Sequence, residues 1–144
     1  MSQTEGVLNP GDERVREILS TMRRVAVVGI SPKEDRASRG IARFLQGRGL
    51  EVLGVNPVLT EPVLSAPLYA TLQDIPGTID VVDIFRRSEA VPPIVDDAIA
   101  AGAKVIWMQE GVMHSEAAAK AVRAGLDVVM DRCLYKEWLR LLNG

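Results

Sequence analysis

The chain has 144 residues, of which 47% are hydrophobic and 25% charged, and this composition is typical of one globular domain with its own core. The formal net charge is −2, so no overall basic field favours nucleic acid or an anionic membrane surface. Aromatic residues make up only 4%, which leaves little material for stacking on nucleotide bases. The sequence therefore predicts no nucleic-acid partner.

Targeting and metal-binding signals are also missing. The N-terminal residues lack the basic start and apolar stretch of a signal peptide, and no apolar run reaches the roughly 18–20 residues of a membrane helix. One cysteine, Cys133, and one histidine allow no internal disulfide and make a poor metal set. We expect a cytoplasmic protein with no membrane association and no metal site.

The first segment, residues 1–11, is expected to form a loose leader. Asp12 is expected to cap a helix that runs to about Met22, because apolar residues recur there at i, i+3, i+4 and i+7. Short, continuously apolar segments then alternate with helical ones. The expected strands are 25–30, 52–55, 80–85, 105–107 and 127–130. The expected helices are 37–48, 88–101, 115–124 and 135–142.

Five β segments separated by helices predict right-handed crossovers and one α/β domain over residues 1–144, with a Rossmann-like, doubly wound parallel sheet. We expect the strand order 3-2-1-4-5. Ligands bind such sheets beyond the carboxyl ends of the strands, at the switch point beside the first strand. The candidate functional residues are therefore those that follow each strand.

The loop after the first strand carries the strongest signal for phosphate binding. Gly29 permits a sharp turn, and the N-terminus of the next helix offers free N–H groups and the positive end of the helix dipole. The alternative is a solvated basic turn whose charge Glu34 and Asp35 balance. The candidate residues here are Gly29, Ile30, Ser31, Pro32, Lys33, Arg36, Ser38 and Arg39.

Further candidates follow the other strands, each with a structural alternative. Asn56-Pro57 follows the second strand, where Asn56 would otherwise only form an Asx-turn. Phe85 and Arg86 follow the third, where the ring would otherwise be buried and the guanidinium solvated. The fourth is followed by Trp107, Met108 and Gln109, and here the alternative is that Trp107 belongs to the core.

The first loop departs from the dinucleotide-binding fingerprint. Ser31 and Glu34 stand where Gly-x-Gly-x-x-Gly requires glycines, and Asn56 stands where an acidic residue would hold a ribose hydroxyl. NAD(P) is thus the lesser choice of ligand, and a small NAD(P)-dependent oxidoreductase is kept as an alternative.

The sequence shows few side chains in arrangements typical of catalysis, and no catalytic residue is predicted. His114 is expected to start a helix and has no evident carboxylate partner. Cys133 precedes the last helix, whose dipole would lower the pKa of a thiol there. A redox-regulated protein that uses Cys133 is therefore a second alternative, and an inert thiol is the other interpretation of this residue.

Several motifs recur in order at the strand ends and resemble the small stand-alone CoA-binding proteins of bacteria and archaea. This family is related to the CoA-binding domain of the succinyl-CoA synthetase α-subunit, and the likeness runs from about Arg24 to the C-terminus. The motifs are Val27-Val-Gly-Ile-Ser-Pro-Lys33, Arg36-Ala-Ser38, Val55-Asn-Pro57, Val81-Val-Asp-Ile-Phe-Arg-Arg87, Val105-Ile-Trp-Met-Gln-Glu-Gly111 and Val128-Val-Met-Asp-Arg-Cys133.

The resemblance implies a nucleotide ligand, coenzyme A or an acyl-CoA, at the strand ends. Ser31-Pro-Lys33 and the segment from Arg36 to Arg39 would hold the diphosphate. Asn56-Pro57 and Phe85-Arg86 would flank the adenosine and its 3′-phosphate, and Trp107-Met-Gln109 would line the pantetheine path.

The synthetase has a second domain with a phosphorylated histidine, and this chain ends before such a domain could begin. Its ligase activity is therefore not carried over. We expect a CoA-binding module that acts as a carrier, a sensor or a partner subunit, and a protein partner is left open.

Overall fold

The structure is a computed structural model that describes residues 4–142. Its α-helices are α1 (Asp12–Thr21), α2 (Ala37–Gly47), α3 (Val91–Ala100), α4 (Ser115–Arg123) and α5 (Leu134–Leu142). Its strands are β1 (Arg24–Val28), β2 (Glu51–Val55), β3 (Leu68–Tyr69), β4 (Val81–Ile84), β5 (Val105–Met108) and β6 (Asp127–Val129). Two short 3₁₀ helices are η1 (Leu72–Asp74) and η2 (Ser88–Ala90).

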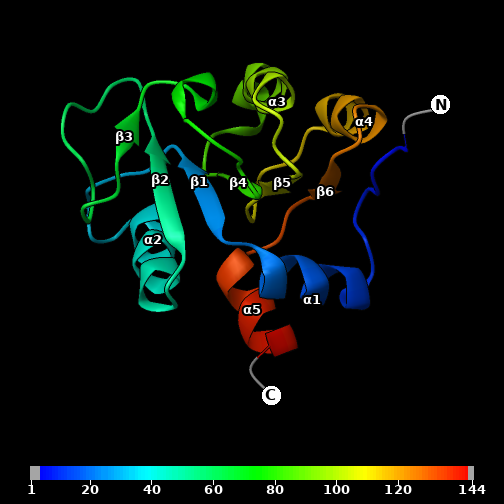
Figure 1. Cartoon of the computed structure of the whole chain (residues 1–144), viewed down its shortest axis with the longest axis horizontal. Helices are drawn as coiled ribbons and strands as arrows, with labels where there is room; N and C mark the ends of the chain where they lie inside the picture. Colours follow the sequence, from blue (N-terminus) through cyan, green and yellow to red (C-terminus); the bar gives the residue numbers. More distant parts are fainter. Residues whose placement is uncertain (1–3, 143–144) are drawn as a thin grey trace.

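The six strands form one parallel sheet in the order β3-β2-β1-β4-β5-β6. Helices α3 and α4 cover one face, and α1, α2 and α5 cover the other (Figure 1). Alternate strand residues enter different cores: Ala26 and Val28 of β1 face α3 and α4, whereas Val25 and Val27 face α1, α2 and α5. The covered faces explain why the strands are continuously apolar, and the predicted Rossmann-like α/β class is confirmed.

The strand count differs from the expected five because β3 was not predicted. β3 has only two residues and follows a proline-rich loop, so it shows no alternating or apolar run. It satisfies the edge of β2, where the Gly54 N–H donates to the carbonyl of Pro67 (2.8 Å) and the Asn56 N–H to that of Tyr69 (3.0 Å). Numbered along the chain, the strands have the order 3-2-1-4-5-6, and the additional strand is β3 at the edge beside β2. Segment 80–85 consequently contains the fourth strand, which pairs with β1.

The leader is not loose where the structure describes it. The Val128 N–H of β6 donates to the carbonyl of Val7 (2.9 Å), the Asn9 N–H donates to the carbonyl of Val128 (2.7 Å), and Leu8 forms a parallel bridge with Val128. The reason is that an edge strand exposes backbone donors and acceptors that a neighbouring segment can satisfy. The leader thus extends the sheet beyond β6.

Two helix starts differ in how they are capped. Gly11 occupies the N-cap position of α1 and Asp12 is the first helical residue, which corrects the expected cap by one position. His114 is the N-cap of α4, where its Nδ1 accepts a hydrogen bond from the Ala117 N–H (3.1 Å). The expectation that His114 starts a helix is confirmed.

Candidate functional site

The turn at Gly29 brings three strand ends together. Gly29 has a φ of +87°, and its N–H donates to the carbonyl of Val55 at the end of β2 (2.8 Å). A Cβ here would lie 2.9 Å from both the carbonyl oxygen of Phe85 and the Cδ of Arg86, just beyond β4. Only glycine fits this conformation and this close approach. The candidate residues after β1, β2 and β4 therefore lie next to one another.

Two hydroxyls fold the loop after β1 onto the start of α2. The Ser31 N–H donates to Oγ of Ser38 (3.1 Å), and the Lys33 N–H donates to Oγ of Ser31 (3.2 Å). Ser38 is buried and Ser31 half-buried. Both serine oxygens act as acceptors here, so the O–H of Ser31 stays available to donate to a ligand.

Asn56 fastens the loop after β2 to the loop after β1. Its Nδ2 donates to the carbonyl of Ile30 (2.9 Å), and its Oδ1 accepts from the Val58 N–H (2.9 Å), which is an Asx-turn. Ile30 is fully buried, whereas Pro57 is exposed. The Asn56 amide therefore uses both its nitrogen and its oxygen within the loops, and it contributes to a ligand site by positioning these loops.

The cations of this region are unpaired among residues 4–142. In the described part of the sequence, the side chains of Lys33, Arg36, Arg39 and Arg86 form no ion pair and no hydrogen bond. Lys33, Arg36 and Arg86 are exposed, and Arg39 is half-buried. Glu34 and Asp35 form no ion pair with them in that part of the sequence, so the turn is basic and solvated, and these acids do not neutralise it through direct contacts.

The N-terminus of α2 is open to an anion. Its N-cap is Arg36, in an extended conformation (φ −89°, ψ 134°) and without a capping hydrogen bond from its side chain. A guanidinium has no acceptor oxygen, so it cannot satisfy the first N–H groups of the helix as Ser, Thr, Asp or Asn would. A cation at this end also opposes the helix dipole. Both features favour a bound anion.

The residues that end and follow β5 lie under the surface. Trp107 and Met108 have 0% exposure, and the Nε1 of Trp107 donates to the carbonyl of Arg132 (2.8 Å). Gln109 is buried, and its Oε1 accepts from the Leu134 N–H at the start of α5 (3.0 Å). The side chains of Trp107 and Gln109 therefore hold the loop after β6 in place. Trp107 belongs to the core, which was the alternative interpretation of this residue. A ligand at this edge would contact the backbone above them.

Gly111 and Asp131 belong to motifs that the sequence indicated, but the sequence did not show that they and Ser88 join the loops after β4, β5 and β6. The Met113 N–H donates to Oγ of Ser88 (2.9 Å), and the Gly111 N–H donates to Oδ1 of Asp131 (2.7 Å). Asp131 has a positive φ of 60°, a conformation that Asp tolerates better than most residues. These bonds join residues far apart in the chain, so spacing alone gives no signal for them.

A groove lies along α2 on the helical face that it shares with α5. Its volume is about 470 Å³. Cys133 is half-buried in its wall, and the rings of Phe44 and Tyr135 meet edge to face with centroids 4.8 Å apart. The residues that line it are Ala37, Gly40, Ile41, Arg43, Phe44, Cys133 and Tyr135.

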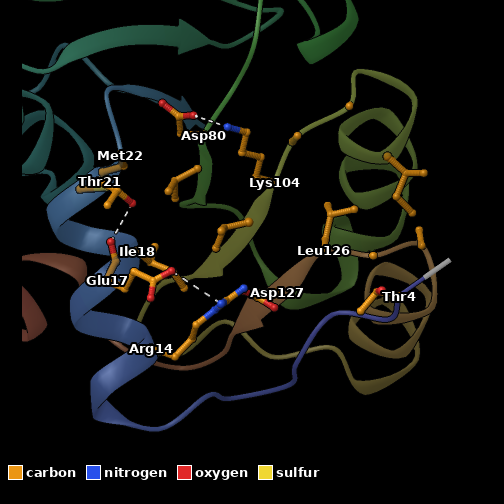
Figure 2. Close-up of a pocket in the computed structure, with 17 residues that line it drawn as sticks. Thr4, Arg14, Glu17, Ile18, Thr21, Met22, Asp80, Lys104, Leu126 and Asp127 are labelled. Carbon is orange, nitrogen blue, oxygen red and sulfur yellow. Dashed lines mark hydrogen bonds and ion pairs between the residues drawn. The ribbon is translucent and has the colours of Figure 1, made fainter.

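A larger hollow of about 800 Å³ lies at the opposite edge, below the amino ends of β4 to β6 (Figure 2). Its charges are paired. Arg14 binds Asp127 (Nη2–Oδ2 2.8 Å), and Lys104 lies 3.5 Å from Asp80. Burial raises the pKa of Asp80, but the backbone N–H groups of Arg24 and Arg23, together with Lys104, outweigh it and hold the pKa below its ordinary value.

Asp83 of β4 is a buried acid with no partner. Its exposure is 0%, and neither carboxyl oxygen has a hydrogen-bond partner within the described range, residues 4–142. Val27 of β1 and Trp107 of β5 are its neighbours in register. Burial raises the pKa of Asp83 well above its ordinary value, so the side chain is held as a neutral acid.

Residues 4–142 contain neither a metal-binding cluster nor a membrane-spanning helix. No cluster of three or more His, Cys, Asp or Glu side chains there could hold a metal ion. None of the helices in that range has the length and apolar character needed to cross a membrane.

Comparison with known proteins identifies the family. The sequence profile of a CoA binding domain matches residues 23–138. The chain belongs to this family of CoA-binding domains. The match spans the Gly29 turn, the cation cluster and all six strands.

Relatives of this CoA-binding domain include both small and large proteins. An uncharacterized protein of Bacillus subtilis, YneT, is 36% identical over 126 residues, which are 88% of this chain and 93% of that protein. A solved structure, a hypothetical protein from Pyrococcus horikoshii OT3, is 39% identical with a TM-score of 0.89, covering 99% of each chain. The ADP-forming acetate–CoA ligase I of Archaeoglobus fulgidus is 29% identical in an alignment of 120 positions that covers 76% of this chain but only 17% of the ligase.

Proposed function

We propose that the chain binds coenzyme A or an acyl-CoA at the carboxyl edge of the sheet, with the diphosphate at the Gly29 turn. The observation that carries the proposal is the cluster of unpaired cations formed by Lys33, Arg36, Arg39 and Arg86. The CoA-binding family and the acetate–CoA ligase relative support the choice of ligand.

The diphosphate would lie against the first turn of α2. Backbone N–H groups and the positive end of the helix dipole favour an anion there, and Ser31 adds a hydroxyl donor. Arg36 and Arg39 are three residues apart and can reach the same side of that turn. Arginine binds phosphate through two parallel N–H donors, which makes such pairs strong and directional.

The adenosine and its 3′-phosphate would lie between Asn56-Pro57 and Phe85-Arg86. Phe85 is half-buried, so part of its ring can pack against a base. The Cγ and Cδ of Arg86 lie beside the Gly29 turn, and its exposed guanidinium has no partner among residues 4–142 that would compete with a phosphate. The pantetheine arm would then pass over the backbone of Trp107, Met108 and Gln109.

We infer that the chain acts as a binding module, as a carrier, a sensor or a subunit of a larger assembly. His114 caps α4 through Nδ1, which leaves that atom no role as a general base. No other catalytic group is assigned, and binding of CoA without chemistry of its own is the function that the site supports best.

A panel of three ligands tests this function. At a concentration about 100-fold above Kd, CoA should stabilise the fold by roughly 2.7 kcal/mol, measured as a rise in melting temperature. 3′,5′-ADP, which lacks the pantetheine arm, should give a smaller rise, and NAD little or none. A larger shift with NAD than with CoA would overturn the proposal.

A further inference from the structure

We propose that the preferred ligand is an acyl-CoA, and that the groove between α2 and the start of α5 holds the acyl chain. This inference rests on the proposed function, because the groove matters only if the CoA phosphates lie at the neighbouring turn of α2.

The lining of the groove fits an apolar chain of small diameter. Ile41, Phe44 and Tyr135 form apolar walls, and Ala37 and Gly40 leave space where larger side chains would fill it. A Cβ on Gly40 would meet no heavy atom within 4 Å. The volume of about 470 Å³ lies within the range of small-molecule sites, roughly 300–1,000 Å³.

The charges around the groove select an amphipathic ligand with an anionic head. Ala37 and Gly40 belong to the first turns of α2, so one end of the groove adjoins Arg36 and Arg39. Arg43 lies on the groove one turn further along, and no acidic residue lines it. The phosphates complement the cations at that end.

The pantetheine arm joins the phosphates to the acyl chain. Its expected path over Gln109 ends beside Leu134, whose N–H donates to Oε1 of Gln109 (3.0 Å). The chain neighbours of Leu134, Cys133 and Tyr135, line the groove.

A chain-length series measures the contribution of the groove. Calorimetric titrations would compare 3′,5′-ADP, CoA, acetyl-CoA, hexanoyl-CoA and decanoyl-CoA. Burial of each added methylene should raise affinity by up to about fourfold until the groove is full. Equal affinities for acetyl-CoA and decanoyl-CoA would overturn the inference and leave the proposed function standing. A chain that binds neither CoA nor 3′,5′-ADP would contradict both.

Two glycines of α2 provide matched variants. Gly40→Leu fills the groove, whereas Gly47→Leu adds the same side chain at the other end of the helix, outside it. A Cβ at either position meets nothing within 4 Å, and Leu is a better helix former than Gly, so both variants should fold.

Gly40→Leu should bind decanoyl-CoA no better than acetyl-CoA while keeping its affinity for 3′,5′-ADP. Gly47→Leu should keep the rise in affinity with acyl-chain length that the parent shows. A Gly40→Leu variant that keeps the chain-length gain would exclude the groove as the acyl site. A concentration-dependent dimer in sedimentation that Gly40→Leu dissolves would instead assign the groove to a second copy of the chain and overturn the inference.

Discussion

The two edges of the sheet differ in how their charges are satisfied. The amino edge has the larger hollow, about 800 Å³, yet its cations Arg14 and Lys104 pair with Asp127 and Asp80. The carboxyl edge adjoins the smaller groove, about 470 Å³, but its Arg36, Arg39 and Arg86 have no partner within residues 4–142. Because an unpaired cation cluster is stabilised when it gains an anion, charge balance indicates the ligand edge better than cavity size does.

The contrast arises from which residues the fold places opposite one another. At the amino edge, α1 and the starts of β4 to β6 supply acids and bases that meet across elements, as Arg14 and Asp127 do over 113 positions. At the carboxyl edge, Arg36 and Arg39 lie on one turn beside Lys33, and the acids Glu34 and Asp35 do not pair with them. The first arrangement stabilises the fold, and the second leaves charge available for binding.

The largest expected effect is on binding at the carboxyl edge. Arg36→Ala should weaken CoA binding by about 10- to 150-fold, because a charge-assisted phosphate contact contributes roughly 1.5–3 kcal/mol. Stability should change by less than about 0.5 kcal/mol, since the side chain is exposed and unpaired. Titration calorimetry and thermal unfolding measure the two effects.

Two further variants control this prediction. Arg36→Lys should restore only part of the affinity, since an ammonium lacks the two-pronged geometry of a guanidinium. Arg123→Ala removes an exposed arginine from α4, away from the strand ends, and should bind normally. Parental affinity in Arg36→Ala would show that the phosphates bind elsewhere.

The amino edge should give the opposite pattern. Arg14→Ala leaves Asp127, whose side chain is only 7% exposed, without its ion-pair partner, and should lower the free energy of unfolding by about 1–2 kcal/mol. CoA affinity should stay within twofold of the parent. Denaturant unfolding and calorimetry on the same samples check both statements. A loss of affinity without a loss of stability would mean that the two edges are not separate in function.

Asp83 is a third case, an acid that is neither paired nor exposed. Burial raises the pKa of Asp83 in the folded state above its unfolded value. The native protein therefore keeps a proton that the unfolded chain releases above about pH 4, and stability falls as pH rises from there toward the folded pKa. At low pH, where both states are protonated, this penalty is absent.

Asp83→Asn removes the titration while keeping the size of the side chain. Its stability relative to the parent should rise as pH increases above about 4, by up to about 1.4 kcal/mol per pH unit until the folded pKa of Asp83 is reached. Burial of the amide without partners adds an offset that does not change with pH. Denaturant unfolding across this pH range gives the difference. If the difference in stability between Asp83→Asn and the parent does not change with pH, the pKa of Asp83 is the same in the folded and unfolded states, which would contradict this prediction.

Much of the fold follows from the sequence because its signals are local. Continuous apolar runs marked every strand except β3, whose existence depends on pairing with the edge of β2. The same holds for the leader, since residues 6–9 are ordered by backbone bonds to β6 and Val122. Pairing energies of this kind come from distant residues and leave no periodic pattern.

For the site, the sequence indicated which residues follow the strands but not which of them are accessible. It gave no means of distinguishing Trp107, which is fully buried, from Arg86, which is exposed. Nor did it show that Asn56 uses its amide to join two loops. The prediction that agrees best with the structure is the sharp turn at Gly29, because the positive φ and the close approach of neighbouring atoms both require glycine.

The leader has a consequence for self-association. A parallel sheet with an open edge offers a template on which another chain can add a strand, the first step toward aggregation. Here the chain covers its own last strand, and the approach is tight enough that a Cβ on Gly6 would clash with the carbonyl of Leu126. The opposite edge ends in the two-residue β3, too short to template much pairing. Both edges are therefore protected, one by a covering segment and the other by its brevity.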